Sequence, residues 1–146
     1  MKVMTKQEVQ AFLMAGTRTG KVATSRKDGV AHVVPIWFIL DKDGNIIFVT
    51  GKQSAKGRHL LRDPRVTFSV DDQAPPFSFV MIEGTAEIDQ APDKAELLKW
   101  ATRIAERYVG REAAEAHGKG IAALEGAILV KIKPTKIIAQ KDMMTH

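Results

Sequence analysis

The sequence predicts a mainly β, α+β fold: an antiparallel barrel of about seven strands with three or four peripheral helices. Short runs rich in β-branched and aromatic residues recur along the chain, as strands require. Asp28-Gly29 and Asp43-Gly44 each separate two such runs, and this dipeptide favours tight hairpin turns. Successive strands are thus joined by tight turns or one small helix, whereas a parallel sheet needs regular crossover helices.

The composition favours a single domain over residues 1–146. The chain is 45% hydrophobic, which is enough for one core, and no linker-like segment divides it. Its net charge of +5 is spread along the chain, which favours anionic ligands without predicting a nucleic-acid-binding face. The sequence has no cysteine, no signal-peptide core and no apolar run approaching about 18 residues. We therefore expect a cytoplasmic protein without a membrane segment.

The first predicted elements are a helix and a hairpin. Thr5 and Glu8 have capping-box spacing, which predicts the start of a short amphipathic helix. A strand over 19–26 and a long apolar strand over 30–40 follow. Because proline has no backbone donor, Pro35 predicts a bulge or a sheet edge within the second strand.

The stretch 46–70 organises the rest of the chain. It reads as a strand over 46–50, a short helix capped by Ser54, and a second strand over 65–70. Hydroxyls and cations crowd the end of the first strand and the start of the helix, at Thr50, Lys52, Ser54, Lys56 and Arg58. A helix N-terminus with nearby cations suits a phosphate or a carboxylate. The pattern is equally consistent with a solvated basic turn.

The remaining chain predicts two helices and three strands. Pro92 suits the N1 position of a helix that runs to Tyr108, and Gly118 ends a second, shorter helix. Gly84 marks a bulge in a long strand, and Pro134 separates the last two strands. The predicted ranges are 77–88, 127–132 and 136–139 for the strands, and 92–108 and 111–117 for the helices.

No residue pattern predicts catalysis by side chains alone. The histidines (His32, His59, His117 and His146) lack metal-ligand spacing, so no metal site is expected, and His32 reads as an ordinary strand histidine. Nucleophile-elbow and glycine-rich nucleotide motifs are also missing from the sequence. No catalytic residue is identified, and an enzyme of this kind would take its reactivity from an organic cofactor.

The segment from Val22 to Ile88 resembles the pyridoxamine 5′-phosphate oxidase-like, FMN-binding split β-barrel superfamily. Within it, the sequence is most similar to the branch that uses the deazaflavin coenzyme F420. The shared motifs are the DG hairpin, PxWF at 35–38, a strand ending in Thr50, SxK at 54–56, DPRV at 63–66, SVDD at 69–72, PPF at 75–77 and EGTAE at 83–87. Their order along the chain makes the resemblance specific to the superfamily.

The resemblance implies a cofactor site. The backbone of the PxWF strand is expected to line the ring system, the SxK motif to bind the phosphate, and Phe77 to come from a second subunit. Arg58, one helical step beyond the motif, either reaches the same anion or is a surface arginine. The implied cofactor-binding residues are Val33, Val34, Pro35, Ile36, Thr50, Gly51, Lys52, Ser54, Ala55, Lys56, Arg58 and Phe77.

One departure from the family pattern bears on the cofactor. The vitamin-oxidising members have an arginine between the serine and the lysine of SxK, where this chain has Ala55. Without that guanidinium, bidentate phosphate recognition is lost, which argues against pyridoxamine phosphate as substrate and weakens the case for FMN. The cations at Lys52, Lys56 and Arg58 suit the longer anionic tail of coenzyme F420.

The resemblance therefore implies a homodimeric oxidoreductase with the cofactor at the subunit interface. It would transfer hydride from reduced coenzyme F420 to an unsaturated organic small molecule. An FMN-dependent oxidoreductase of the same superfamily is the first alternative. A non-enzymatic cofactor carrier or ligand-binding split barrel is the second.

Overall fold

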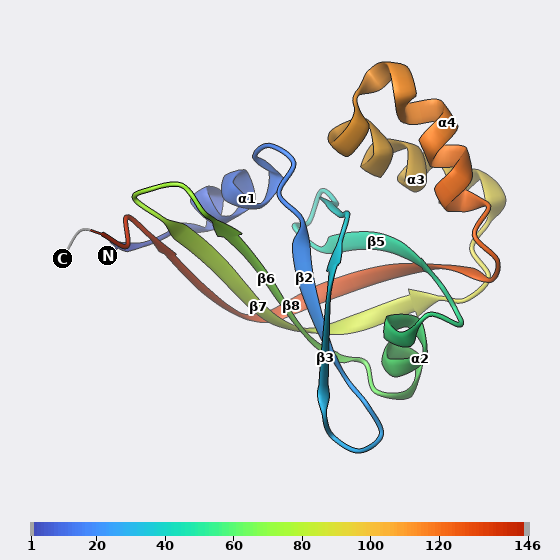
Figure 1. Cartoon of the computed structure of the whole chain (residues 1–146), viewed down its shortest axis with the longest axis horizontal. Helices are drawn as coiled ribbons and strands as arrows, with labels where there is room; N and C mark the ends of the chain where they lie inside the picture. Colours follow the sequence, from blue (N-terminus) through green and yellow to red (C-terminus); the bar gives the residue numbers. More distant parts are fainter. Residues whose placement is uncertain (1, 145–146) are drawn as a thin grey trace.

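The computed structural model describes residues 2–144, which form one antiparallel sheet and four helices (Figure 1). The strands are β1 (Lys2–Val3), β2 (Gly20–Ser25), β3 (Ala31–Ile36), β4 (Ile39–Leu40), β5 (Ile46–Gly51), β6 (Arg65–Asp72), β7 (Ser78–Asp89) and β8 (Ala127–Lys141). The helices are α1 (Lys6–Met14), α2 (Ala55–Arg62), α3 (Lys94–Val109) and α4 (Arg111–Ala122). The predicted capping box is present, because Thr5 and Glu8 exchange side-chain to backbone hydrogen bonds at the start of α1.

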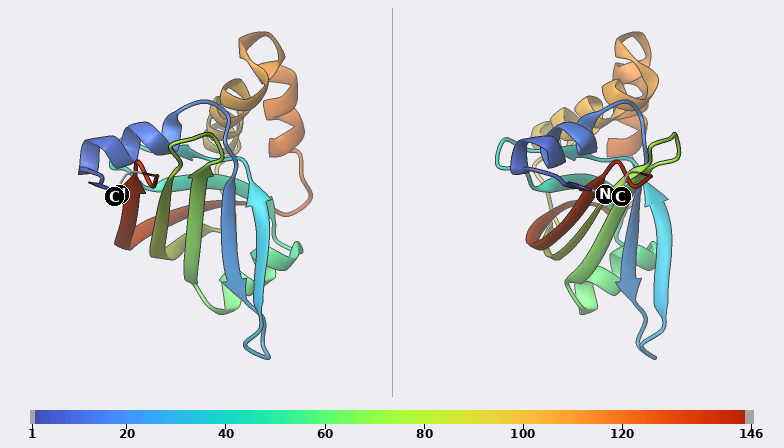
Figure 2. Two further views of the ribbon diagram at one scale, coloured as in Figure 1. Left: turned by 60° about the vertical axis from the view of Figure 1, so that its left-hand side comes forward. Right: turned by 90° about the vertical axis from the view of Figure 1, so that its left-hand side faces the viewer.

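The sheet is a split barrel, as predicted. Its strand order is β3-β2-β6-β7-β8-β5-β4, with β1 added to β8, and it curls strongly (Figure 2). The two edge strands, β3 and β4, are consecutive in the chain and are joined by Trp37 and Phe38. Within residues 2–144 no ladder joins these two edges. The barrel is therefore open along this seam, and Pro35 lies in an edge strand, where a missing backbone donor is tolerated.

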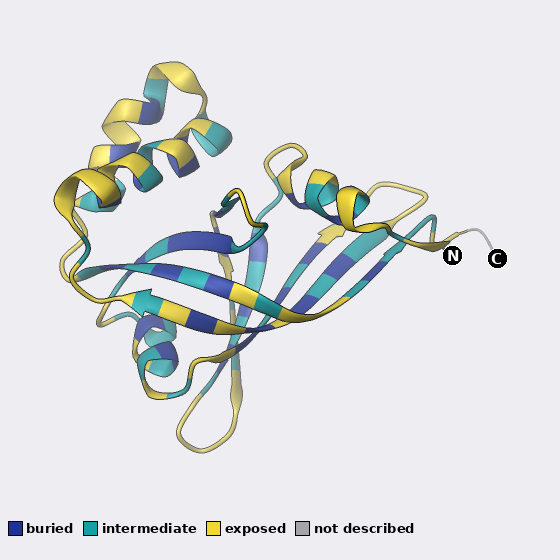
Figure 3. Cartoon of the chain, turned by 180° about the vertical axis from the view of Figure 1, so that it is seen from behind, coloured by how far each residue is buried: buried dark blue, intermediate teal, exposed yellow. Residues whose placement is uncertain are grey.

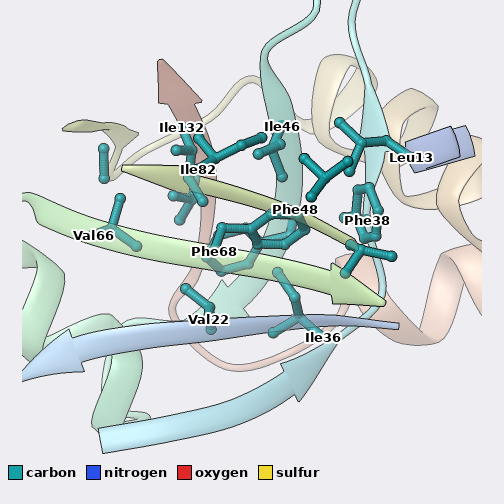
Figure 4. Packing of buried hydrophobic residues seen from close by; sticks show 14 of the residues in the cluster. Leu13, Val22, Ile36, Phe38, Ile46, Phe48, Val66, Phe68, Ile82 and Ile132 are labelled. Carbon is teal, nitrogen blue, oxygen red and sulfur yellow. The ribbon is translucent and has the colours of Figure 1, made fainter. Parts of the chain in front are cut away.

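The barrel encloses one main hydrophobic core (Figure 4). Phe38, Phe48 and Phe68 are fully buried, and the rings of Phe38 and Phe68 meet edge to face at 4.9 Å. Phe38 lies at the seam between β3 and β4, and Phe68 lies on β6. The contact between their rings therefore fixes the distance between the seam and β6. Ile46, Ile82 and Ile132 fill the space around the rings.

Two predicted boundaries are wrong. Pro92 does not open α3, because Asp93 is the N-cap and accepts a hydrogen bond from the backbone N–H of Glu96 at 3.2 Å. Gly118 does not end the last helix, because α4 continues to Ala122. Gly118 lies instead where α4 packs closely against Thr102 of α3.

The last two predicted strands are one strand, β8. The register passes from Gly84 opposite Pro134 to Glu83 opposite Lys136, so Thr135 is the extra residue of a bulge. The hydroxyl of Thr135 donates to the carbonyl of Glu83 at 3.0 Å, which holds the two strands together across the bulge. The expected irregularity at Gly84 is confirmed, and this bulge also accommodates Pro134.

The helices α3 and α4 form a hairpin that packs over β4 and β5 (Figure 3). Ile104 of α3 packs with Ile39 and Ile47 in a second, smaller buried cluster. In the described part of the chain, no helix is long and apolar enough to cross a membrane.

Candidate functional site

The end of β5 and the start of α2 are joined by a closed set of hydrogen bonds. The Ser54 hydroxyl donates to the Gly51 carbonyl at 2.8 Å and accepts from the Gly57 backbone N–H at 3.1 Å. Thr50 Oγ1 lies 2.9 Å from Ser54 Oγ, and Thr50 is 3% exposed. Because the single proton of Ser54 is already given to Gly51, the Thr50 hydroxyl is the donor. Ser54 thus holds the corner together, and its hydroxyl is fully used within the protein.

Gly57 allows α2 to lie directly against the strand end. A Cβ at this position would be 2.4 Å from the Gly51 carbonyl oxygen, which is backbone and has no room to yield. Ala55 lies between Ser54 and Gly57, the two residues that hold α2 against β5, and it carries only a methyl group. The first turn of α2 is therefore fixed against β5, and the direction in which Lys56 leaves the helix is fixed with it.

Lys56 enters a cavity of about 210 Å³ next to the barrel seam, which we call the Lys56 pocket. Its other lining residues come from four elements and are apolar: Pro35, Ile36, Trp37, Val49, Ile104, Ile121 and Leu124. The pocket therefore combines one cation with walls from β3, β5, α3 and the α4 region. It brings the predicted anion-binding corner and the predicted ring-binding strand to the same place.

Lys56 is a charge without a partner. Its side chain is half-buried, and among residues 2–144 it makes no hydrogen bond or ion pair. Burial lowers the pKa of the Lys56 ammonium below its ordinary value, because an apolar pocket solvates a charge less well than water does. An anionic group in the pocket would remove this penalty. The site therefore fits a ligand that places a phosphate or carboxylate beside apolar surface.

The four predicted residues of β3 divide between the two faces of the sheet. Val34 packs against the barrel core and Ile36 is buried in it, whereas Val33 is 59% exposed on the opposite face. Pro35 and Ile36 line the Lys56 pocket. Since β3 pairs only with β2 in the described chain, the other edge of its backbone is free to face a ligand.

Helix α3 holds the seam beside this pocket. The Tyr108 hydroxyl donates to the carbonyl of Arg18 at 3.0 Å and lies 3.3 Å from the backbone N–H of Phe38, which donates to it. The Tyr108 ring stacks on Trp37 with 5.0 Å between centroids and an interplanar angle of 6°. Tyr108 thus supplies a hydrogen bond that a neighbouring strand would otherwise make, and it orients Trp37 as a pocket wall.

Arg107 reinforces the same contact. Its guanidinium donates to the carbonyls of Leu13, Gly16 and Phe38, at 2.7, 3.1 and 2.8 Å respectively. One side chain therefore ties α3 to the end of α1 and to the seam. Burial lowers the Arg107 pKa from its very high ordinary value, but the guanidinium remains a cation at neutral pH.

Of the predicted site residues, only Pro35, Ile36 and Lys56 line the Lys56 pocket; Lys52, Arg58 and Phe77 are three of those that do not. Lys52 is exposed, and its backbone N–H donates to the Gly126 carbonyl at 2.8 Å. Arg58 is exposed and lies about 200° around α2 from Lys56, because successive helical residues turn by about 100°. Phe77 precedes β7, whereas the corner lies beyond the far end of that strand, where Asp89 pairs with Leu129 (Figure 1). Within one chain the fold does not bring Phe77 to Lys56.

A pair of histidines lies between α2 and the β2–β3 hairpin. His59 Nδ1 is 2.9 Å from the Thr24 hydroxyl, and the His32 and His59 rings meet edge to face at 5.2 Å. His32 Nδ1 is buried without a hydrogen-bond partner in the described structure. Burial lowers the pKa of His59, and nearby His32 and the arginines 62, 58 and 26 lower it further. The pair is therefore a contact between α2 and the β2–β3 hairpin that favours the neutral form of His59.

Sequence reasoning missed the helical side of the pocket. Ile104 was readable as an apolar residue of a predicted helix, but its partner strands were not. Ile121 and Leu124 follow a glycine that was interpreted as a helix end, so no element was assigned to them. Trp37 belongs to a recognised motif, yet its stacking on Tyr108 joins residues far apart in the chain.

The comparisons with known proteins agree with the split-barrel fold. A family profile described as pyridoxamine 5′-phosphate oxidase matches residues 5–141. The conserved hypothetical protein Rv2991 of Mycobacterium tuberculosis is 28% identical, with a TM-score of 0.82, and the match covers 99% of this chain and 91% of that one. A protein described as an F420 reductase is 26% identical, with a TM-score of 0.64 and coverage of 87% and 94%.

A more distant structure shows the fold alone. The heme storage protein HutZ of Vibrio cholerae is 14% identical, with a TM-score of 0.72 and coverage of 95% of this chain and 96% of that one. No curated protein sequence matches the chain. The shared barrel thus hosts different functions, and the side chains of the site must decide between them.

Proposed function

The chain belongs to the pyridoxamine 5′-phosphate oxidase family, and we propose that it is an oxidoreductase that uses coenzyme F420 to reduce an unsaturated organic molecule. The observation that carries the proposal is Lys56, a half-buried ammonium without a protein partner in a pocket whose other walls are apolar. This donor set fits a cofactor with a phosphate and a large flat ring system. When bound, the cofactor supplies the hydride.

The protein's own residues would bind and orient the cofactor. Lys56 neutralises the phosphate, while Thr50, Gly51, Ser54 and Ala55 shape the corner and keep it rigid through the hydrogen bonds already described. Lys52 and Arg58 are exposed, and two such cations suit an extended anionic tail better than a compact phosphate. The edge of β3, from Val33 to Ile36, borders the ring region.

A second copy of the chain would complete the site. Val33 is 59% exposed on the outer face of the sheet, where the neighbouring strands present mostly small or uncharged side chains, including Ala23, Thr67 and Ser69. Such a face suits a twofold contact between subunits. Phe77 is distant from Lys56 within one chain, so its contribution to a cofactor site requires the partner.

The test is a fluorescence titration of the purified protein with coenzyme F420 and, in the same buffer, with FMN. We expect tighter binding of F420, and binding that weakens with added salt because exposed cations contribute. Ala55→Arg supplies the missing guanidinium and should reduce the difference between the affinities for F420 and FMN by strengthening FMN binding. Micromolar FMN binding without detectable F420 binding would contradict the choice of cofactor.

Turnover separates the remaining alternative. The alternative to an enzyme is a non-enzymatic cofactor carrier, since the barrel is also the fold of a heme storage protein. An oxidoreductase oxidises reduced F420 when an acceptor with an electron-poor double bond is added, and the absorbance of the oxidised deazaflavin reports this. Tight cofactor binding without oxidation by any acceptor in a panel would favour the carrier.

A further inference from the structure

Helix α4 carries a shallow hollow of about 380 Å³ beside the Lys56 pocket. We call it the α4 hollow; its lining residues are Ala116, His117, Gly120, Ile121 and Leu124. Ile121 and Leu124 also line the Lys56 pocket, so the two spaces share a wall. A molecule in the α4 hollow would therefore contact two of the side chains that a molecule in the Lys56 pocket contacts.

The charge of the two spaces differs. The Lys56 pocket contains an ammonium, whereas the side chains that line the α4 hollow include no carboxylate, ammonium or guanidinium. His117 is the one titratable group among them. Two nearby charges on the same helix neutralise each other, because Lys119 Nζ lies 3.1 Å from a Glu115 carboxylate oxygen. An ionic group in the α4 hollow would thus find no side chain of opposite charge in the lining.

The apolar side chains of this region are unusually accessible. Leu124 is 47% exposed and Trp37 is 37% exposed, and both border the shared wall. The glycine at 120 leaves the middle of the hollow open, since no atom lies within 4 Å of the position of a Cβ there. The volume suits a small molecule and is too small for a helix or strand of another protein.

Resting on the proposed function, we infer that the α4 hollow binds the substrate and selects an uncharged, largely apolar unsaturated molecule. The cation of the neighbouring pocket is then reserved for the cofactor. Ile121 and Leu124 supply the apolar surface on which the substrate packs. Charged analogues of the same shape are disfavoured, because no lining side chain offers them a counter-charge.

The experiment compares two probes of nearly equal shape, cinnamamide and cinnamate, by calorimetric titration of the full chain loaded with F420. Cinnamamide should bind roughly tenfold more tightly, because the carboxylate of cinnamate finds no cation once Lys56 is neutralised. In the cofactor-free protein the preference should shrink, since Lys56 then attracts cinnamate. Leu124→Lys should reduce the preference by roughly two- to fivefold in the loaded protein.

The matched control is Leu98→Lys, which places the same charge on α3 at an exposed position that lines neither space. It should leave the preference unchanged. If F420 does not bind the wild-type chain, the proposed function fails and the inference falls with it. If F420 binds but the two probes bind equally, the inference alone is wrong. If Leu124→Lys changes the oligomeric state without changing the ratio of affinities, the hollow is a contact between copies and the inference is overturned.

Discussion

Lys56 illustrates how a binding residue can work against the stability of its own protein. The first turn of α2 is fixed by Ser54 and Gly57, so the lysine enters the apolar pocket whether or not an anion is present. Burial lowers its pKa, which means that the folded protein holds the charged form less favourably than the unfolded chain does. A bound anion would stabilise the charged form of Lys56 in the folded protein and so raise its pKa.

We predict opposite effects of Lys56→Met on stability and on binding. Methionine fills the same space without a charge, so the melting temperature of the cofactor-free variant should be equal to or higher than that of the wild type. Its affinity for F420 should fall by roughly 1.5–3 kcal/mol, the range of a hydrogen bond to a charged group. Thermal unfolding and fluorescence titration measure the two effects. Lys42→Met, at an exposed turn position, is the control, and an unchanged affinity in Lys56→Met would remove Lys56 from the site.

His59 makes α2 sensitive to pH. Burial, His32 and the arginines 62, 58 and 26 lower its pKa in the folded state below the ordinary value of 6.5. Above that value the imidazole is neutral in both states. As the pH falls below about 6.5, the unfolded chain takes up a proton that the folded chain resists, so the free energy of unfolding decreases.

The variant His59→Gln should therefore show a shallower loss of stability between about pH 6.5 and pH 5 than the wild type. Glutamine keeps a side chain able to bond with Thr24, whose hydroxyl lies 2.9 Å from His59 Nδ1. Urea unfolding at several pH values gives both slopes. Parallel curves for the two proteins would show that His59 does not titrate differently on folding. His117→Gln, at an exposed position on α4, serves as the comparison.

At the scale of elements, α4 is the helix that positions the α4 hollow, and one glycine sets its distance from α3. A Cβ at Gly118 would be 2.5 Å from Thr102 Oγ1 and 2.7 Å from Thr102 Cα. The second atom is backbone, so a larger residue must push the helices apart. Gly120, one half-turn further, has nothing within 4 Å of the same position.

These two glycines give a matched pair of predictions. Gly118→Ala should destabilise the protein by roughly 1–3 kcal/mol through overpacking and should weaken cinnamamide binding, because Ile121 and Leu124 move with the helix. Gly120→Ala should be neutral or stabilising by up to about 1 kcal/mol, since alanine is the better helix former. Chemical denaturation measures both. Equal stability of the two variants would contradict the close approach at Gly118.

The same region shows what sequence reasoning can reach. The corner from Thr50 to Ser54 was predictable, because capping, strand end and helix start are all set within a few residues. The closure of the seam was not predictable, because its hydrogen bonds join Phe38 to Tyr108 and Arg107, about 70 residues away in the sequence. Gly118 was misread for a related reason: locally it signals a helix end, and only the neighbouring helix explains it.

At the scale of the whole molecule, one chain leaves the outer face of the sheet available. In register across β2 and β6, Ala23 faces Thr67 and Lys21 faces Ser69, and the next residues on β7 are Glu83 in the first row and Met81 in the second. All of these side chains except Glu83 are half-buried within the single chain, and only Lys21 and Glu83 are charged. A partly buried sheet face of this composition is typical of a surface that pairs with a copy of itself.

We predict that the chain is a homodimer and that Thr67→Arg disrupts it. Thr67 lies in the outer face between Ala23 and Glu83 and does not line the Lys56 pocket, so a charge there would meet its copy across a twofold axis without entering the cofactor pocket. Light scattering at micromolar concentration should give a dimer for the wild type and a monomer for the variant. Leu98→Arg adds the same charge on α3 and should leave the dimer intact. If the cofactor lies between subunits, the monomeric variant should also bind F420 at least about tenfold more weakly, because a part of the site is lost with the partner. A monomeric wild-type protein, or a monomeric variant with full affinity, would mean that each chain holds its cofactor alone.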